Sequence, residues 1–372
     1  MPGSPDAVPA GGALPGSAHP PFVTRWDLDK TYLRTEFDTL GDLVRTAFER
    51  PDQKRAVPGA AALLRALGET GARVHILSGS PKQLGARLEE KLRIDRVRWD
   101  ELTLKPNLSN MLRLRLRALR DQLGYKLPAL LSSRVRDQNR GAAGGPLCEV
   151  LVGDDAEADA FVYSLYGDIC SGKVDRALLE RVLRTGQVYP DQFRVCLDAH
   201  AELTLAPAVE RILIHLDRQS PPSHFDAYGP CVVPFYNYLQ AAFVLAEDGR
   251  LSGSAVLDVA AILAIHHRFD GEALGRSYLD LMRRGHSKGT IGPALRDALR
   301  AGGGLRETAA GGPPREAAAM PALEEMTDLV EGYLRSPPVP RAIPAPQADY
   351  LDLASRHRSG RNRKQFQSIT GN

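Results

Sequence analysis

The sequence predicts an α/β protein built on a parallel β-sheet. Three short apolar segments rich in β-branched residues have the composition of strands, and three helix-like runs, 58–67, 83–92 and 126–133, lie between them. The order strand, helix, strand, helix, helix, strand is typical of parallel sheets with right-handed helical crossovers. Each strand also ends in acidic or hydroxyl side chains, and sheets of this kind bind ligands beyond the carboxyl ends of their strands.

The first strand covers residues 22–26 and leads into two carboxylates, Asp27 and Asp29. Side chains two positions apart in an extended segment point the same way, so these acids face one space. Two such acids repel each other and lose hydration, and a cation or a proton between them offsets this cost. The alternative is that Asp29 caps a turn while Asp27 is merely solvated.

The second strand covers residues 73–77 and ends in a hydroxyl group at Ser78, while the third covers residues 148–153. The third strand stops at an acidic run that contains Asp154 and Asp159. Because parallel strands end at the same edge of a sheet, these side chains are expected to converge with the two acids of the first strand.

The expected cluster has carboxylates and hydroxyls but no histidine or cysteine. Such a set of hard oxygen ligands suits Mg²⁺ rather than Zn²⁺ or copper. A carboxylate can also act as the nucleophile in phosphoryl transfer and form an aspartyl-phosphate. The oxygens of the transferred group carry negative charge, so a cation and a positioned hydroxyl are needed beside it.

Four motifs in this order resemble those of the haloacid dehalogenase superfamily of aspartate-nucleophile phosphatases. The likeness is closest to the phosphatidate phosphatase App1 catalytic domain and covers roughly residues 20 to 175. The motifs are Asp27-x-Asp29-x-Thr31, Ser78-Gly79-Ser80-Pro81, Tyr125-Lys126-Leu127, and Gly153-Asp154-Asp155 through Asp159 to Tyr163. Two positions depart from the App1 pattern, which has Asp where this chain has Lys30 and Ser where it has Asp155. These departures leave the choice of substrate open.

The resemblance implies a role for each matched residue. Asp27 would be the nucleophile and a Mg²⁺ ligand, and Asp29 would protonate the leaving oxygen, activate water and contribute to the metal site. Asp154 would complete the metal ligands. Asp159, also placed among the metal-site residues, would orient a metal-bound water or the lysine.

The resemblance also implies contacts to the phosphoryl group. Ser78 would donate a hydrogen bond to it, with Thr31 and Gly79 beside it. Lys126 is the favoured phosphate-site lysine, with Lys105 as the alternative. For either lysine the competing interpretation is a solvated surface charge.

Composition limits the class of protein. A chain of 372 residues is long enough for two folded units, and its net charge of +3 does not indicate a nucleic-acid binder. Its four cysteines form no CxxC pair, which favours a reducing, cytoplasmic setting. The first twenty residues lack the pattern of a signal peptide, and no run reaches the ~20 apolar residues of a membrane span. Membrane contact is therefore expected to be peripheral.

The expected units are a disordered lead (1–20), a phosphatase domain (21–175), an all-helical domain (176–300), and a linker, short helix and basic disordered tail (301–372). Residues 32–57 have the spacing of an amphipathic helix, expected to form a small cap. The helical runs expected in the second half are 177–183, 208–216, 233–245, 255–266, 277–284 and 322–334. His266 and His267, and likewise His215 with Asp217, are expected at helix ends rather than in a metal site.

These observations together predict a Mg²⁺-dependent phosphohydrolase with a Rossmann-like sheet, a small cap and a helical carboxyl-terminal domain. Its substrate is expected to be a phosphate ester, with phosphatidate or another phospholipid suggested by the resemblance. Two alternatives stay open: a binding or scaffold protein that kept the fold without turnover, and a soluble phosphometabolite phosphatase. The oligomeric state is not predicted.

Overall fold

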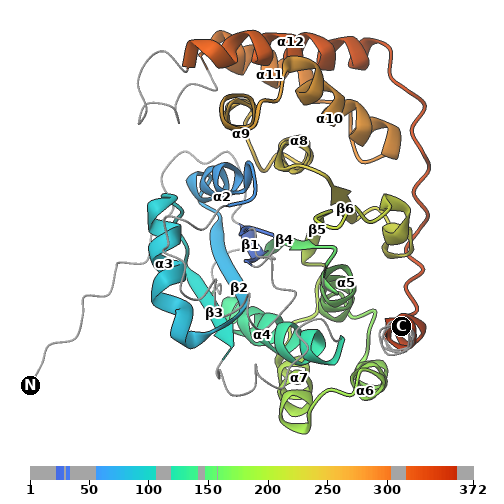
Figure 1. Ribbon diagram of the computed structural model, residues 1–372. Helices are drawn as coiled ribbons and strands as arrows, with labels where there is room; N and C mark the ends of the chain where they lie inside the picture. Colours follow the sequence, from blue (N-terminus) through green and yellow to red (C-terminus); the bar gives the residue numbers. More distant parts are fainter. Residues whose placement is uncertain are drawn as a thin grey trace, which may run out of the picture.

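The computed structural model describes residues 22–28, 31–33, 56–105, 119–140, 147–156, 158–302 and 316–357. Within these residues the chain forms a six-stranded sheet in the order β3-β2-β1-β4-β5-β6, with each neighbouring pair parallel. Helices cover both faces of this sheet (Figure 1). The predicted α/β fold with a parallel, Rossmann-like sheet is confirmed.

The strand order reverses beside the first strand. The strands are β1 (Phe22–Asp27), β2 (Arg73–Pro81), β3 (Glu101–Lys105), β4 (Cys148–Asp154), β5 (Val209–His215) and β6 (Val232–Phe235). The chain runs outward from β1 through β2 to β3 and then crosses to β4 on the other side of β1. The carboxyl ends of β1 and β4 therefore flank the switch point, where open α/β sheets hold their ligands.

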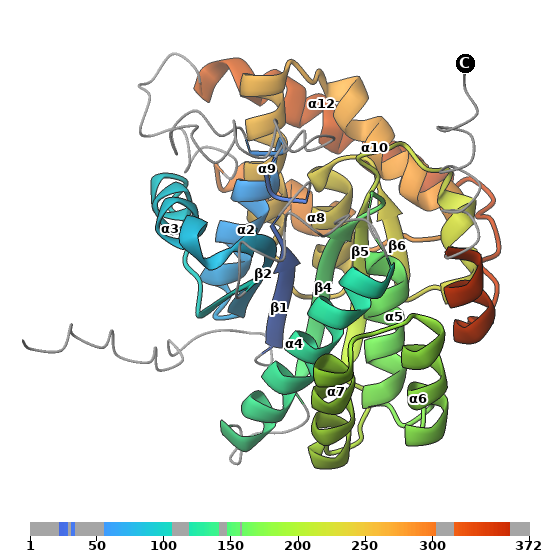
Figure 2. The ribbon, with the colours of Figure 1, turned by 60° about the horizontal axis from the view of Figure 1, so that its bottom comes forward.

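Two layers of helices enclose the sheet (Figures 1 and 2). One face is covered by α4 (Leu119–Arg140), α5 (Asp159–Cys170), α6 (Arg176–Thr185) and α7 (Pro190–Glu202), whose apolar side chains form one core. The other is covered by α2 (Ala60–Glu69), α3 (Gly85–Ile94), α8 (Tyr238–Glu247) and α9 (Gly253–His267), which form a second core. A short helical turn, η1 (Lys82–Leu84), precedes α3, and another, η3 (Pro222–Tyr228), precedes β6. The helices expected at 58–67 and 83–92 are confirmed as α2 and α3.

The expectation of an all-helical second half is wrong at two places. Residues 208–216 form the strand β5, and the start of 233–245 belongs to β6. β5 pairs with β4 on one side and β6 on the other, so its apolar residues are covered on both faces of the sheet. A strand covered on both faces has a continuous apolar run, which hydrophobic periodicity cannot distinguish from a buried helix. The remaining expected helices of this half are confirmed as α6, α8, α9, α10 and α12.

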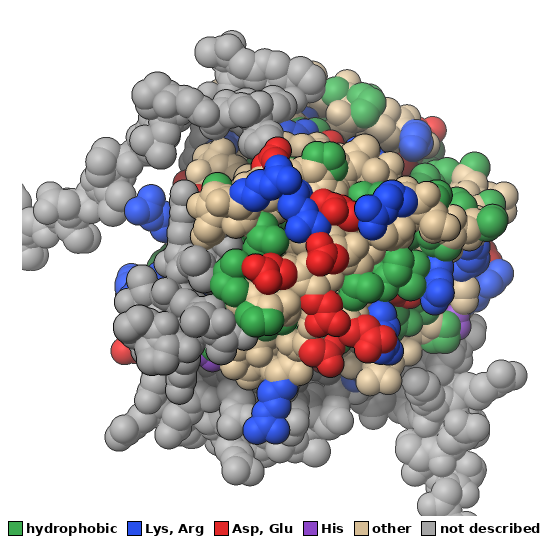
Figure 3. All heavy atoms as spheres, turned by 90° about the horizontal axis from the view of Figure 1, so that it is seen from above, with side chains coloured by type: hydrophobic (Ala, Val, Ile, Leu, Met, Phe, Trp, Pro, Cys, Tyr) green, Lys and Arg blue, Asp and Glu red, His purple; other side chains and the backbone are tan. Residues whose placement is uncertain are grey.

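A third layer of helices packs on α8 and α9. It consists of α10 (Gly271–Arg284), α11 (Gly292–Arg300) and α12 (Glu316–Arg335). On α11, Arg296 pairs with Asp328 at 2.5 Å and with Glu331 at 2.7 Å on α12. Seen from above, acidic and basic side chains lie close together on this face (Figure 3). The outer surface of the layer is thus of mixed charge.

After α12 the chain runs along one side of the molecule and ends its described course in helical residues 350–357 beside α5 (Figure 1). The Tyr350 hydroxyl donates to Asp168 Oδ2 at 2.6 Å, and the Tyr350 ring meets the Phe161 ring edge-on at 5.7 Å. This contact anchors the segment that follows the proline-rich run.

Several expectations concern segments that the structure does not describe. The disordered lead (1–20), most of the expected cap (32–57) and the tail beyond 357 lie outside the described residues. The two ends of the cap segment are described: Leu33 and Ala56 form an antiparallel bridge, and the Val57 amide donates to the Tyr32 carbonyl at 2.8 Å.

Candidate metal centre

Three acidic side chains meet at the switch point of the sheet. Asp27 is the last residue of β1, Asp154 is the last of β4, and Asp159 is the first of α5. One carboxylate oxygen of each lies within 4.8 Å of the others. All three are buried, with exposed fractions of 1%, 1% and 0%. We call Asp27, Asp154 and Asp159 the acidic centre.

The sheet register and one glycine place these acids. Trp26 pairs with Val152, so adjacent parallel strands carry Asp27 and Asp154 to the same edge. Between β4 and α5 the chain folds back, and the Asp154 amide donates to Asp159 Oδ2 at 3.1 Å. A Cβ atom at Gly153 would lie 2.3 Å from that oxygen, so only glycine leaves room for the Asp159 carboxylate.

A buried lysine joins the acidic centre. Lys126 lies on α4 with 1% of its surface exposed, and its Nζ is 3.1 Å from Asp27 Oδ1. The same ammonium group forms an ion pair and hydrogen bond with Asp159 Oδ1. Buried ionic groups need such pairing because burial removes their hydration. The interpretation of Lys126 as a solvated surface charge is therefore wrong.

The other candidate lysine lies elsewhere. Lys105 ends β3, two strands from β1, and its Nζ lies 5.1 Å from the ring centroid of Tyr125. It is also buried, at 7% exposed, so it is not a surface charge either. Among the described contacts, Lys126 forms the ion pairs with Asp27 and Asp159.

Two hydroxyl residues border the acidic centre. The Thr31 hydroxyl lies 3.4 Å from Asp27 Oδ2 and 3.5 Å from Asp154 Oδ2, between the two strand ends. Ser78 follows Leu77, the partner of Asp27 in the register of β1 and β2. Both hydroxyl residues are fully buried. The Ser78 Oγ accepts a hydrogen bond from the Ser80 amide at 3.0 Å, which fixes the turn after the strand.

The remaining residues of the four motifs have separate positions. Gly79 lies between the two serines of β2 and is half-buried. Asp29 and Lys30 lie outside the described residues. Asp155 accepts hydrogen bonds from the amides of Arg218 at 2.8 Å and Ser220 at 2.9 Å, so this departure from the App1 pattern anchors the loop after β5.

The structure adds His215 to the edge of the site. The expectation that His215 ends a helix is wrong, because it is the last residue of β5 and pairs with Asp154 in the sheet. Its ring stacks on Tyr238 at 5.5 Å, and Tyr238 stacks on Trp26 at 5.7 Å. The Tyr238 hydroxyl donates to the Thr31 carbonyl, which holds the segment after β1 in place. Reading 209–215 as a strand would have revealed this position.

The expected helix end at His266 and His267 is confirmed. His266 and His267 lie in the last turn of α9, where a positive charge interacts favourably with the helix end.

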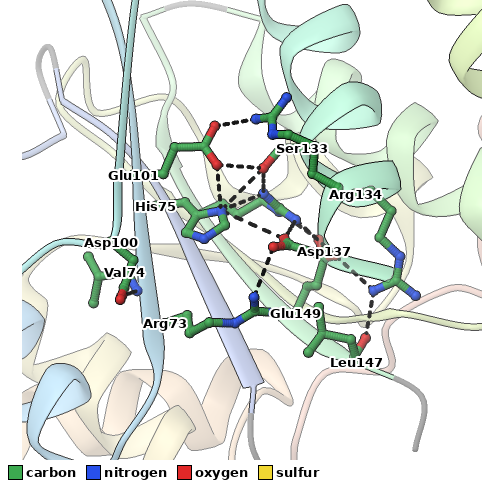
Figure 4. A network of polar contacts seen from close by, with 12 residues as sticks. Arg73, Val74, His75, Asp100, Glu101, Ser133, Arg134, Asp137, Leu147 and Glu149 are labelled. Carbon is green, nitrogen blue, oxygen red and sulfur yellow. Dashed lines mark hydrogen bonds and ion pairs between the residues drawn. The ribbon is translucent and has the colours of Figure 1, made fainter. Parts of the chain in front are cut away.

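A buried ionic network ties α4 to the sheet (Figure 4). The Arg25 guanidinium, fully buried on β1, donates to Glu149 Oε2 at 2.9 Å, Asp137 Oδ2 at 2.8 Å and Ser133 Oγ at 2.8 Å. It also donates to Nδ1 of His75 at 2.9 Å. Because Ser133 and Asp137 follow Lys126 along α4, this network fixes the helix that carries the lysine.

Burial and ion pairing oppose each other in the network. Burial alone would lower the pKa of Arg25 and raise that of Glu149, but their mutual ion pair reverses both shifts. Burial, and then the charge of Arg25, lower the pKa of His75 to about 3. His75 is therefore neutral near neutral pH.

Comparison of the chain with protein-family models, curated proteins and solved structures finds no match. The function is therefore inferred from the site itself. Among the described helices, none is long and apolar enough to cross a membrane.

The acidic centre has the chemistry of a site for a hard divalent cation. Its facing ligand atoms are carboxylate oxygens, which Mg²⁺ prefers over nitrogen or sulfur donors. Asp27 and Asp154 would hold the ion from the two strand ends. Asp159 pairs with Lys126 and accepts a hydrogen bond from the Asp154 amide, so it would orient these groups beside the ion.

Proposed function

We propose that this protein is a Mg²⁺-dependent phosphate-monoester hydrolase that forms an aspartyl-phosphate on Asp27. The observation that carries the proposal is the meeting of Asp27, Asp154, Asp159 and Lys126 in one buried cluster at the switch point. Mg²⁺, when bound, would neutralise charge on the phosphoryl oxygens. The motif resemblance to aspartate-nucleophile phosphatases points to the same chemistry.

In the first step, a carboxylate oxygen of Asp27 attacks phosphorus as the ester P–O bond breaks. The leaving oxygen takes a proton from Asp29, the proton donor that the motif resemblance implies. Lys126, within 3.1 Å of the Asp27 carboxylate, supplies positive charge where the phosphoryl oxygens would lie. Asp159 holds the lysine in that position.

In the second step, water attacks the phosphorus of the aspartyl-phosphate and gives up a proton to Asp29, which lost its own proton in the first step. The P–O bond to Asp27 breaks, orthophosphate leaves and the carboxylate is restored. The hydroxyl of Thr31, placed between Asp27 and Asp154, supports the geometry of both acids.

Phosphate release from p-nitrophenyl phosphate tests the proposal. The wild-type protein should release phosphate with Mg²⁺ and stop when EDTA removes it, and Asp27→Asn should be inactive while keeping the circular dichroism spectrum of the folded wild type. Equal rates in the wild type and Asp27→Asn would exclude Asp27 as the nucleophile. A folded wild type that releases no phosphate would favour the scaffold alternative.

A substrate panel then separates the proposed substrate classes. Phosphatidate in vesicles should be compared with soluble sugar and nucleotide monophosphates under the same Mg²⁺ conditions. A preference for phosphatidate would support the phospholipid expectation, and a preference for a soluble ester would favour the phosphometabolite alternative.

A further inference from the structure

One buried hydroxyl beside the acidic centre has no hydrogen-bond partner among the described residues. Tyr163 lies on α5, one helical turn after Asp159, and is 0% exposed. Buried hydroxyl groups normally find a partner, because burial without one costs the hydration they lose. Such an exception beside a cluster of charged groups calls for an explanation, and a bound ligand would supply the missing partner.

Other buried tyrosines of this protein follow the usual rule. The Tyr166 hydroxyl, three residues further along α5, donates to Glu149 at 2.8 Å. The Tyr278 hydroxyl on α10 donates to Glu247 Oε1 at 2.6 Å, and the Tyr238 hydroxyl donates to the Thr31 carbonyl. Tyr163 therefore differs from buried tyrosines of the same chain in similarly packed helices.

The surroundings of Tyr163 are the charged groups of the site. Lys126 Nζ lies 6.0 Å from the centre of the Tyr163 ring. Burial raises the pKa of Tyr163 most, and the nearby carboxylates of the acidic centre raise it further while Lys126 lowers it. The hydroxyl thus stays protonated and can donate a hydrogen bond at any working pH.

We propose that the Tyr163 hydroxyl donates a hydrogen bond to an oxygen of the phosphoryl group bound at Asp27. Tyr163 would then be a further catalytic residue of the proposed phosphatase, and the inference rests on that function. The acidic centre repels an anion, so donors are needed to hold the phosphoryl oxygens against three carboxylates. Lys126 from α4 and Tyr163 from α5 supply one charged and one neutral donor.

Tyr163→Phe tests this inference because it removes only the hydroxyl oxygen. In the full chain with Mg²⁺ and p-nitrophenyl phosphate, kcat should fall by about 10²-fold, a size typical of losing one donor to a developing anion. Inhibition by orthophosphate should weaken as well. The melting temperature should be unchanged or higher, because no hydrogen bond within the described protein is lost.

Tyr278→Phe is the matched control. It removes a hydroxyl that does have a partner, far from the site, so its melting temperature should fall while its kcat stays unchanged. A wild-type kcat and wild-type inhibition by orthophosphate in Tyr163→Phe would overturn the inference and leave the phosphatase proposal standing. A wild type without Mg²⁺-dependent turnover would instead overturn the proposed function, and the inference with it.

Discussion

Replacement of Lys126 by methionine should destabilise the protein strongly, and the structure sets the size of the effect. The ammonium group is 1% exposed and pairs with Asp27 and Asp159, so its loss leaves two buried carboxylates without their shared cation. Removing one partner of a buried ion pair costs about 3–5 kcal/mol. Methionine has a similar volume and flexibility, so little of that cost should come from a cavity.

Urea unfolding of Lys126→Met, followed by circular dichroism with and without Mg²⁺, measures this cost. Mg²⁺ at about 100 times its dissociation constant would add about 2.7 kcal/mol to the stability of a protein that binds it only when folded. It should restore more stability to the variant than it adds to the wild type, because the ion replaces the lost positive charge.

Lys173→Met is the control for removing a lysine. Lys173 is 66% exposed and pairs with Asp168 at 3.1 Å on the surface. Such surface pairs contribute about 0–1 kcal/mol, so this variant should unfold almost as the wild type does. A cost below about 1 kcal/mol for Lys126→Met, or an equal response of variant and wild type to Mg²⁺, would show that Lys126 does not neutralise the two carboxylates.

Three other predictions concern the site and the ionic network. Gly153→Ala should abolish Mg²⁺-dependent turnover, because its Cβ displaces the Asp159 carboxylate; retained activity in a kinetic assay would contradict this. Asp154→Asn should raise the Mg²⁺ concentration needed for half-maximal rate, and an unchanged Mg²⁺ titration would remove Asp154 from the metal site. Folding lowers the pKa of His75 from 6.5 to about 3. Below about pH 6.5, His75 therefore binds a proton in the unfolded chain but not in the folded one. The free energy of unfolding should then fall by about 1.4 kcal/mol for each pH unit below 6.5 because of this group. Urea unfolding at pH 7 and pH 5 measures that slope, and His75→Asn should reduce it; an equal slope in both proteins would place the titration elsewhere.

The sequence allowed the central strands and their acids to be predicted. The segments that became β1, β2 and β4 are apolar, β-branched and followed by acids or hydroxyls, so both their direction and their polar ends could be inferred. The meeting of Asp27 with Asp154 then follows from parallel topology alone.

Other elements depended on packing that the sequence does not display. β3, residues 101–105, alternates polar and apolar residues at the sheet edge and was not predicted. β5 was mistaken for a helix because it is covered on both faces, and His215 was misplaced with it. Arg25 lies in an otherwise apolar strand, and its partners Glu149 and Asp137 are more than a hundred residues away. Whether a hydroxyl such as that of Tyr163 has a partner is likewise known only from the folded chain.

Trapping of the covalent intermediate shows whether Asp27 is phosphorylated during turnover. The protein should be mixed with a phosphate monoester and Mg²⁺, quenched in acid, reduced with borohydride and mapped by peptide mass spectrometry. The proposed mechanism predicts reduction of the side chain at position 27, dependent on both substrate and Mg²⁺ and absent in Asp27→Asn. Steady Mg²⁺-dependent phosphate release with no modification at position 27, or with modification of another residue, would contradict it.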